Sequence, residues 1–349
     1  MRNQFIQRLR TAARILIKGQ EITPFRDVPS ITPEEVEDVK NFFPMDKFFI
    51  FGHARSGTTL LTRLIRLHPK VHCNYQAHFF TRKPFLEDLV TREEMGWWFT
   101  HHSNRWNRGE DLSAVVLRAA ADMILERDAH RAGKGAPGCI VGDKSPNNLV
   151  NGEGVRRMVK VYPDARLVFI VRDGRDAVVS HRFQAFVEKR HFLSPEGRKI
   201  RQDFINDPEP FLTGQRSIFT EDAISQAAEE WAFNVNDTVQ TAQALIGDQF
   251  YTLRYEDILA QTWETMTQLW QFLGVDPETE GLHALVENEM QRNPDAAWQK
   301  QKSNEIADSL KKGKKGTWRE LFTNRDRRIF KQIAGKTLID WRYETDHEW

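Results

Sequence analysis

The segment from residue 48 to residue 60 has the residue types and spacing of an anion-binding loop. It reads Phe-Phe-Ile-Phe-Gly-His-Ala-Arg-Ser-Gly-Thr-Thr-Leu, and four strand-forming apolar residues run into Gly52 before a helix predicted to begin near Thr58. A glycine loop between a strand and a helix directs several backbone N–H groups and the positive end of the helix dipole to one point. The sequence therefore predicts a phosphate site here.

The charge of this loop differs from that of a Walker A loop. Gly52 and Gly57 have the Walker spacing, but Thr58 occupies the position of the Walker lysine and the positive charge lies at Arg55. We therefore expect a site that holds phosphate groups without ordinary nucleoside-triphosphate chemistry.

A second cation follows another predicted strand. Residues 167–171 form an apolar run, Arg172 comes directly after it, and Ser180 lies about two turns inside the helix expected next. Ligands of open α/β sheets bind beyond the carboxyl ends of the strands, so Arg172 is expected at the same edge as the glycine loop. A guanidinium and a hydroxyl suit a second phosphate group. The alternative is a surface arginine, or one paired with Asp173 or Asp176.

Two further lysine-containing patterns could add charge to this edge. Lys144 lies just after the strand predicted at 138–142, in the sequence Asp-Lys-Ser-Pro. Residues 311–319 read Lys-Lys-Gly-Lys-Lys-Gly-Thr-Trp-Arg, in which lysines around glycines could close over an anion together with backbone N–H groups. The alternative for this run is a solvated loop.

Together these patterns resemble the sulfotransferase family that uses 3′-phosphoadenosine 5′-phosphosulfate (PAPS). Its 5′-phosphosulfate loop is matched by Arg55, Ser56, Gly57, Thr58 and Thr59. Arg172 and Ser180, eight positions apart (180 − 172), resemble its 3′-phosphate site. Its C-terminal cofactor clamp is matched by Lys311, Lys312 and Gly313, and its tyrosine near the adenine by Tyr255. The matches span residues 47 to about 335.

The resemblance implies both a fold and an activity. The fold is α/β, a three-layer parallel sheet flanked by helices with P-loop-NTPase-like sulfotransferase architecture. The activity is in-line transfer of a sulfuryl group from PAPS to a hydroxyl or amine acceptor, without a metal ion. Arg55 and the loop N–H groups are expected to hold the 5′-phosphosulfate, and Lys144 to stabilise the leaving oxygen.

The general base departs from the family pattern. Many relatives have a glutamate just after the second strand, whereas this chain has Gln76, which cannot accept a proton at neutral pH. His78 is our candidate base, because the unperturbed pKa of histidine, ~6.5, is close to operating pH. A histidine packed in the core is the competing interpretation. Further candidates for the base are His101, His102, Asp143 and Glu87.

Two different functions are consistent with parts of the sequence. Gln76 allows a nucleotide-binding relative without catalysis. A P-loop kinase would need Lys or Arg at position 58 and Ser or Thr at position 59, and only the second condition is met.

Composition limits the partners. The 349 residues are 40% hydrophobic and 28% charged, which is ordinary for a globular protein. A net charge of +1 argues against nucleic-acid binding by the whole molecule. Two cysteines provide no disulfide framework, which suits a reducing, cytoplasmic location. The expected acceptor is a carbohydrate, a lipid or a small molecule, and the sequence leaves a protein tyrosine open as well.

The chain is predicted to have three parts. Residues 1–20 form a basic amphipathic helix that could contact an anionic membrane surface or pack on the domain. Residues 21–45 are predicted to be a linker, and residues 46–349 the sulfotransferase domain.

Within the domain, alternating apolar runs and helical patterns predict a parallel sheet with crossover helices. A long helix is expected over 221–247, ended by Gly247. Residues 81–110 and 190–220 fit no regular pattern and are predicted to be binding loops or surface packing segments. The predicted strands are 47–52, around 70–74, 138–142, 166–171 and 249–254.

Overall fold

The computed structural model describes residues 28–81, 90, 110–146, 151–188, 191, 193–292 and 316–349. Several predictions concern residues outside this part of the chain. They are the helix at 1–20, most of the segment 81–110, and the lysine segment at 311–315.

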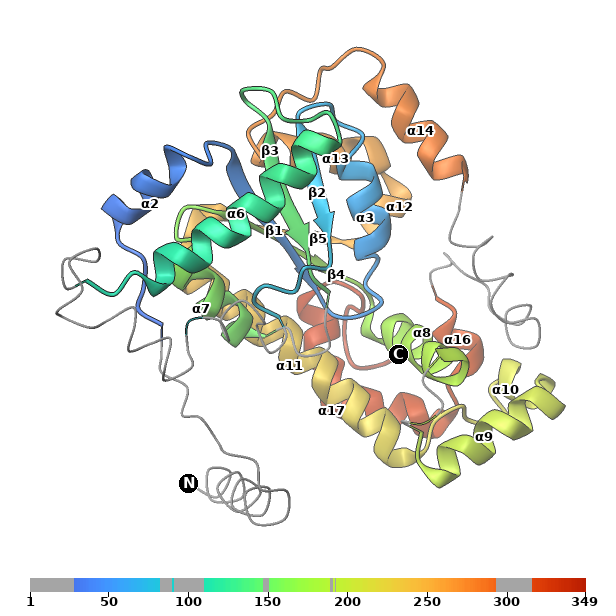
Figure 1. Ribbon diagram of the computed structural model, residues 1–349. Helices are drawn as coiled ribbons and strands as arrows, with labels where there is room; N and C mark the ends of the chain where they lie inside the picture. Colours follow the sequence, from blue (N-terminus) through green and yellow to red (C-terminus); the bar gives the residue numbers. More distant parts are fainter. Residues whose placement is uncertain are drawn as a thin grey trace.

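A parallel five-stranded sheet forms the centre of the described residues, in the order β2-β3-β1-β4-β5 (Figure 1). The predicted α/β fold, a parallel sheet flanked by helices, is confirmed. The five strands lie close to their predicted bounds: β1 (Asp46–Gly52), β2 (Val71–Tyr75), β3 (Ile140–Lys144), β4 (Arg166–Val171) and β5 (Phe250–Arg254).

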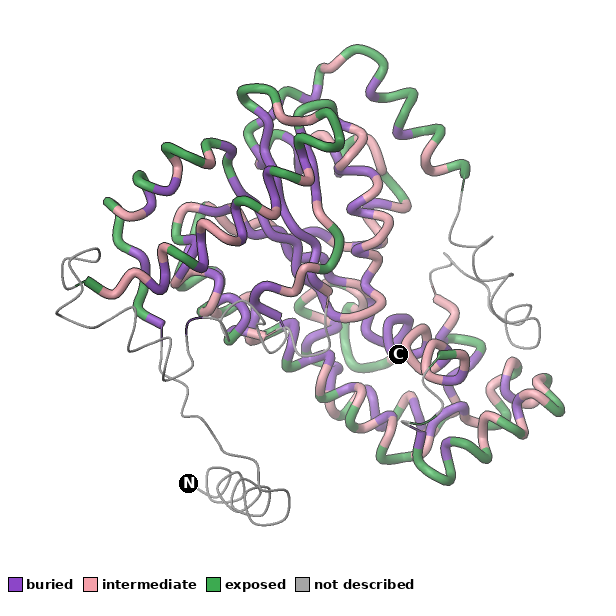
Figure 2. The backbone as a smooth tube through the Cα atoms, in the orientation of Figure 1, coloured by how far each residue is buried: buried purple, intermediate pink, exposed green. Residues whose placement is uncertain are grey.

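Side chains of the central strands alternate between two hydrophobic layers. Phe49 and Phe51 of β1 face one layer, whereas Phe48 and Ile50 face the other. Because both faces are covered, the strands are apolar throughout, as expected for a parallel sheet. The strands are accordingly among the most buried segments in Figure 2.

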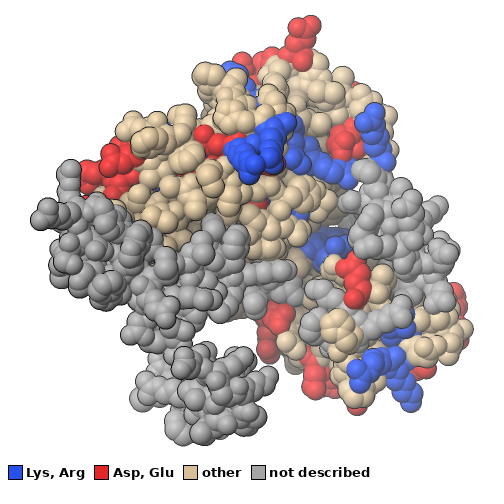
Figure 3. Space-filling view, viewed as in Figure 1, with Lys and Arg blue, Asp and Glu red and all other residues tan. Residues whose placement is uncertain are grey.

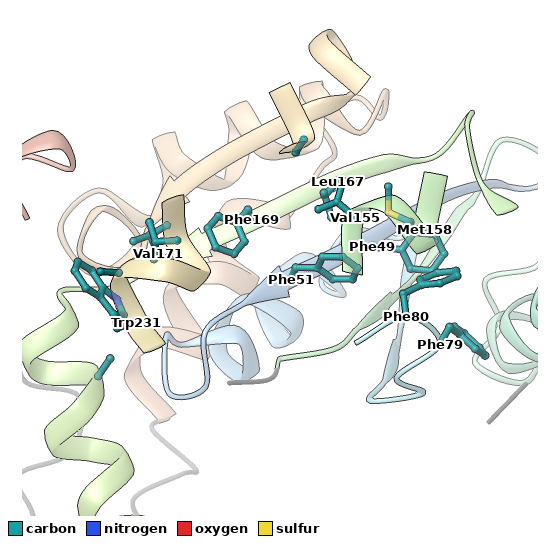
Figure 4. Packing of buried hydrophobic residues seen from close by; sticks show 14 of the residues in the cluster. Phe49, Phe51, Phe79, Phe80, Val155, Met158, Leu167, Phe169, Val171 and Trp231 are labelled. Carbon is teal, nitrogen blue, oxygen red and sulfur yellow. The ribbon is translucent and has the colours of Figure 1, made fainter. Parts of the chain in front are cut away.

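The first layer contains the larger group of helices. Figure 4 shows Phe49, Phe51 and Phe169 of the sheet on the same side as Val155 and Trp231 of the helices. In Figure 1, α11 and α17 run side by side. The helices of this layer are α2 (Pro33–Lys40), α6 (Ser113–Arg131), α7 (Gly152–Val161), α8 (Gly174–Glu188), α9 (Pro195–Asn206), α10 (Glu209–Leu212), α11 (Glu221–Ile246), α16 (Trp318–Leu321) and α17 (Asn324–Asp340).

The opposite face of the sheet is covered by four helices of the described residues. Leu61, Leu64 and Ile65 of the first helix pack with Trp270 of the third. These helices are α3 (Thr58–Ile65), α12 (Tyr255–Ala260), α13 (Thr262–Phe272) and α14 (Leu282–Arg292), and a short 3-10 helix, η2 (Gly247–Gln249), precedes β5.

Strand register brings the carboxyl ends of the strands to one edge. Gly52 pairs with Ile170, Tyr75 pairs with Lys144, and Val171 pairs with Arg254. The loop after β1, the residue after β4 and the first residue of α12 therefore all emerge at this edge, where the glycine loop and Arg172 were predicted to lie.

The prediction of irregular structure for residues 190–220 was wrong. Most of this segment is helical, in α9 and α10. Ser194 caps α9 by accepting a hydrogen bond from the backbone of Gly197, and Pro195 occupies the first turn. Serine followed by proline is a helix-start signal, but the weak apolar periodicity after it concealed the helix.

The prediction of a linker was also wrong for residues 28–45. This part contains α2, which begins with a capping box between Thr32 and Glu35. Val28, Ile31 and Val36 are buried in the first hydrophobic layer. Burial of these apolar side chains makes the segment part of the domain.

Charges on the surface are mixed. On the face shown in Figure 3, groups of Lys and Arg side chains alternate with Asp and Glu. Within the described residues, no helix is both long enough and apolar enough to cross a membrane.

Candidate active site

Two glycines shape the loop between β1 and α3. A Cβ atom at Gly52 would lie 2.8 Å from the Ile170 side chain of the neighbouring strand. Gly57 caps α3 with a φ of +88°, and a Cβ there would lie 2.1 Å from the ring of Tyr255. Other residues would clash at these positions, and Gly57 also requires a left-handed backbone.

Arg55, Arg172 and Ser180 meet at the carboxyl edge, as predicted. Nε of Arg55 donates to Oγ of Ser180 at 3.1 Å. Nη1 of Arg172 donates to the backbone oxygen of Arg55 at 3.0 Å. The loop after β1 is thereby joined to the segment after β4 and to helix α8, across more than a hundred residues of sequence.

Tyr255 completes this corner of the site. Its buried ring lies against Gly57, and the guanidinium of Arg172 lies 4.9 Å from the ring centroid. The neighbouring Glu256 accepts a hydrogen bond from the backbone N–H of Asp173 at 3.1 Å, which holds the start of α12 against the start of α8. The tyrosine therefore supports both the loop and the arginine.

Two buried polar atoms here lack a hydrogen-bond partner among the described residues. They are Oγ of Ser56 and Nε of Arg172. The first N–H groups of α3 also have no acceptor within the helix. An unsatisfied buried donor is costly unless a ligand accepts its hydrogen bond. The edge is therefore suited to an anion with several acceptor oxygens.

Lys144 brings an ammonium group to the same loop. Its side chain is fully buried, and Nζ donates to Oγ1 of Thr59 at 3.4 Å. The ammonium also lies 4.3 Å from the centroid of the Tyr75 ring, a cation–π distance. We did not predict Tyr75; its position at the end of the second strand, beside Gln76, was the available signal.

His78 belongs to a tightly held turn after β2. Its backbone N–H donates to Oγ of Ser145 at 3.0 Å, and its Nδ1 lies 2.9 Å from Oγ1 of Thr81. Phe79 and Phe80, which follow it, are buried in the first hydrophobic layer. The imidazole is thus oriented by Thr81 at the edge of the core, close in sequence to Gln76.

Asp143 holds this turn in place. Its Oδ1 accepts from the backbone N–H of Ala77 at 3.0 Å, and its Oδ2 accepts from the hydroxyl of Ser145. Burial raises the pKa of Asp143, and these hydrogen bonds oppose the rise. Both carboxylate oxygens of Asp143 therefore accept hydrogen bonds that hold the turn, which favours a supporting role for this residue over that of general base. The candidate bases His101, His102 and Glu87 lie outside the described residues.

Backbone strain concentrates at this edge. Among the described residues, the non-glycine residues with positive φ are Arg55, Gln76, His78 and Arg342, and the first three belong to the turns just discussed. Such conformations cost of order 1–3 kcal/mol each and cluster at functional sites. The surrounding hydrogen bonds hold them in place.

His53 ties the loop to α11. Its Nδ1 lies 3.0 Å from the side-chain amide nitrogen of Asn234. The amide nitrogen can only donate, so Nδ1 accepts and the neutral ring carries its proton on Nε2. Burial, together with nearby His181, lowers the pKa of His53 to about 3. The ring is therefore uncharged at neutral pH.

The residue that follows the lysine segment, Gly316, contacts this site. Lys311, Lys312 and Gly313 lie outside the described residues. The backbone N–H of Gly316, however, donates to Oδ2 of Asp176 at 2.6 Å. Asp176 is therefore not a simple ion-pair partner of Arg172, and its spacing of four residues from Ser180 was the signal for a shared face of α8.

Comparison with known proteins identifies the family of this chain. The model of the sulfotransferase family matches residues 47–280, more than half of the chain. The chain belongs to the sulfotransferase family. The resemblance predicted from the motifs is thereby confirmed. The matched range contains the glycine loop, Lys144, Arg172, Ser180 and Tyr255, and it ends before the lysine segment.

Named relatives of this chain include two animal proteins. Protein-tyrosine sulfotransferase A of Caenorhabditis elegans is 25% identical over 46% of this chain and 38% of its own length. The protein-tyrosine sulfotransferase of Drosophila melanogaster is 25% identical over 68% of this chain and 40% of its own length. The matches thus cover about two fifths of these relatives.

Among solved structures, a mouse sulfotransferase complexed with PAP is similar to this chain. The identity is 15%, the match covers 88% of this chain and 90% of the mouse chain, and the TM-score is 0.45.

Proposed function

We propose that this sulfotransferase moves a sulfuryl group from PAPS to a hydroxyl or amine acceptor by in-line transfer. The observation that carries the proposal is the contact of Arg55 with both Arg172 and Ser180. It joins a loop suited to one phosphate group with an arginine and a hydroxyl suited to another. A nucleotide with separate 5′ and 3′ groups satisfies both.

The residues of this edge fit such a nucleotide. Oγ of Ser56 and Nε of Arg172 have no hydrogen-bond partner among the described residues, and both are donors that a phosphate could accept from. We assign the 5′-phosphosulfate to Arg55, Ser56, Gly57, Thr58 and Thr59. We assign the 3′-phosphate to Arg172, Ser180, Lys311, Lys312 and Gly313. We assign Tyr255 to the neighbourhood of the adenine. When bound, PAPS supplies the sulfuryl group and a phosphate leaving group.

Lys144 is proposed to act on the charge that develops during transfer. Its buried ammonium is in contact with Thr59, at the start of α3. A cation in a site from which water is excluded stabilises a growing negative charge more strongly than one in water. The contact holds the ammonium beside the loop that receives the 5′ group, and no metal ion is assigned to this role.

His78 is proposed to be the general base. Thr81 contacts Nδ1, which orients the ring so that Nε2 can take the proton of the acceptor. The hydrogen bonds that Asp143 accepts support this choice, because that carboxylate is engaged in holding the turn. Gln76 lies at the end of the same turn and cannot replace the base.

The acceptor class is open to direct test. The two named relatives are protein-tyrosine sulfotransferases, which supports a protein tyrosine among the four acceptor classes that the sequence leaves open, namely a carbohydrate, a lipid, a protein tyrosine and a small molecule. A screen with radiolabelled PAPS against these four classes would identify which one receives the label. The cytoplasmic location and the membrane contact through residues 1–20 stay predictions.

Calorimetry tests the proposed function. Adenosine 3′,5′-bisphosphate should bind the full chain, whereas ATP with Mg²⁺ should bind at least tenfold more weakly. Arg172→Ala should weaken the bisphosphate about tenfold or more and adenosine 5′-monophosphate much less, because a charge-assisted hydrogen bond to the 3′ group is lost. Preferential binding of ATP with Mg²⁺ would instead favour a kinase. Selective bisphosphate binding without transfer to any acceptor would identify a non-catalytic relative.

A further inference from the structure

The segment after α17, residues 341–349, packs against the starts of α8 and α12. The hydroxyl of Tyr343 donates to Oε2 of Glu256, in the first turn of α12, at 3.0 Å. Glu344 forms an ion pair with Arg175, in the first turn of α8. Because both helices begin at the carboxyl edge of the sheet, the segment lies next to the candidate nucleotide site.

Glu256 links this segment to the backbone beside Arg172. Its Oε1 accepts from the backbone N–H of Asp173 at 3.1 Å, and its Oε2 accepts from Tyr343. Burial raises the pKa of Glu256, and the hydrogen bonds from Asp173 and Tyr343 oppose the rise. Both carboxylate oxygens therefore have donors. Since Asp173 directly follows Arg172, this bridge fixes the backbone from which the Arg172 side chain extends.

Arg175 provides a second link between the segment and Asp173. Its buried guanidinium pairs with Oδ2 of Asp173 at 2.7 Å and with Glu344. It also lies 4.4 Å from the centroid of the Trp349 ring, and Figure 1 shows this end of the chain beside α8. The segment thus reaches Asp173 through two side chains, Glu256 and Arg175.

The guanidinium of Arg172 depends on the position of this backbone. It lies 4.9 Å from the centroid of the Tyr255 ring, and Tyr255 directly precedes Glu256. The carboxylate of Glu256 therefore fixes both the backbone beside the arginine and the backbone beside the ring that the arginine contacts. Nε of Arg172 is buried without a hydrogen-bond partner among the described residues. The bridge thus determines where this donor lies.

We propose that Glu256 and Tyr343 are positioning residues, through which the segment after α17 holds Arg172 in place for the 3′-phosphate. The inference rests on the proposed function, which assigns the 3′-phosphate to Arg172. Hydrogen bonds between a guanidinium and a phosphate require a defined geometry. A guanidinium that is already in place also loses less conformational entropy when the phosphate binds.

The first test is Tyr343→Phe, which removes one hydroxyl and leaves the charges of the site unchanged. We expect the Kd of adenosine 3′,5′-bisphosphate, measured by calorimetry on the full chain, to rise about fivefold. The Kd of adenosine 5′-monophosphate, which lacks the group assigned to Arg172, should rise less than about twofold. The KM for PAPS should follow the bisphosphate, with kcat changed by less than about twofold. In an Arg172→Ala background, Tyr343→Phe should have no further effect on the bisphosphate.

Glu256→Gln separates positioning from electrostatics. A carboxylate beside a phosphate site repels the anion, so loss of its charge alone should tighten binding. Glutamine keeps the shape of the side chain, but its amide nitrogen cannot accept a hydrogen bond, so one of the two links is lost. We therefore expect the bisphosphate to bind about fivefold more weakly and adenosine 5′-monophosphate to change by less than about twofold. Tighter binding of the bisphosphate would overturn the inference.

Tyr162→Phe is the matched control. The buried hydroxyl of Tyr162 also donates to a carboxylate, that of Asp122 at 2.8 Å, but this pair lies beside Lys47 near the start of β1. The variant should have a lower melting temperature and an unchanged ratio of the two nucleotide affinities. If the wild type binds the bisphosphate but Tyr343→Phe leaves that ratio unchanged, the inference is wrong and the proposed function stands. A wild-type chain that fails to bind the bisphosphate would overturn both.

Discussion

The ammonium of Lys144 is enclosed by the protein, next to a threonine hydroxyl and above a tyrosine ring. Removing an ammonium from water is unfavourable, so a fully buried lysine needs compensating contacts. Thr59 and Tyr75 supply two of these. A negatively charged group beside Thr59 would compensate the buried ammonium more strongly than either contact. For this reason we place the negative charge of the transition state beside Thr59.

Lys144→Met should reduce kcat by roughly 10²–10³-fold, because the substitution keeps the length of the side chain and removes the charge that acts on the leaving oxygen. The KM for PAPS should change by less than about threefold. Initial-rate kinetics with radiolabelled PAPS measure both.

Lys134→Met is a suitable comparison for Lys144→Met. Lys134 donates to the backbone oxygens of His68 and Val71, at 2.9 and 2.8 Å, and burial lowers its pKa to about 8. Its loss should reduce stability and leave kcat unchanged. A large rise in KM with normal kcat in Lys144→Met would assign Lys144 to nucleotide binding alone.

His78→Asn should abolish most of the transfer, by at least about 10²-fold in kcat, if the imidazole takes the proton of the acceptor. Asparagine keeps a polar atom near Thr81 but does not titrate. Retained activity would exclude His78 and direct attention to His101, His102 and Glu87.

At the level of elements, the loop between β1 and α3 is held from both faces of the sheet. Tyr255 at the start of α12 packs on Gly57 from one side. From the other side, Asn234 of α11 contacts His53. Because the strained Arg55 lies between these supports, its conformation depends on two elements that are remote in sequence.

His53 makes stability depend on pH in a defined direction. Its folded pKa, about 3, is below the unfolded value of 6.5, so the unfolded state binds the proton first as pH falls. Stability from the neutral ring is complete above pH 6.5 and is lost progressively below it. Between pH 6.5 and 5 the loss from this residue should be about 1.5 kcal/mol.

Urea unfolding of His53→Asn measures this contribution. Asparagine keeps an acceptor for Asn234 and removes the titration, so the variant should lose less stability than the wild type over this pH range. The slope of the free energy of unfolding against pH must be compared between the variant and the wild type. Buried carboxylates such as Asp143, whose pKa is raised, change this slope in the opposite direction. Equal slopes for His53→Asn and the wild type would contradict the prediction.

At the level of the whole molecule, the site joins parts of the chain that belong to different layers. The glycine loop leads into the layer of α3, whereas α8 and the segment at Gly316 belong to the layer of α11 and α17. A ligand that contacts both layers should therefore stabilise the entire fold and not one element alone.

Adenosine 3′,5′-bisphosphate at 100 times its Kd should stabilise the full chain by about 2.7 kcal/mol. Thermal unfolding should show a single transition that moves upward by several degrees. ATP with Mg²⁺ should produce a much smaller shift, and EDTA should not change the effect of the bisphosphate. Equal shifts from both nucleotides would contradict the proposed selectivity for a 3′-phosphate.

Much of the fold was predictable from local sequence. The apolar runs at 47–52 and 166–171 predicted central strands, and the periodicity of 221–247 predicted α11. The helix α9 and the packed segment at 28–45 were missed, because their start signals, Ser194 with Pro195 and Thr32 with Glu35, precede helices with few apolar residues. The starts of these helices were therefore indicated by their capping residues and not by apolar periodicity.

The sequence by itself determined that this chain has a glycine loop after β1, an arginine after β4, and a parallel sheet that brings them to one edge. Strand propensity, turn chemistry and helix starts act over a few residues, so they can be read locally. The tertiary structure alone decided that Asp176 holds Gly316, that Asp143 supports the turn at Ala77, and that Tyr75 lies beneath Lys144. These partners are chosen by how the layers pack, since contacts between distant segments depend on side-chain shape and burial across the whole core.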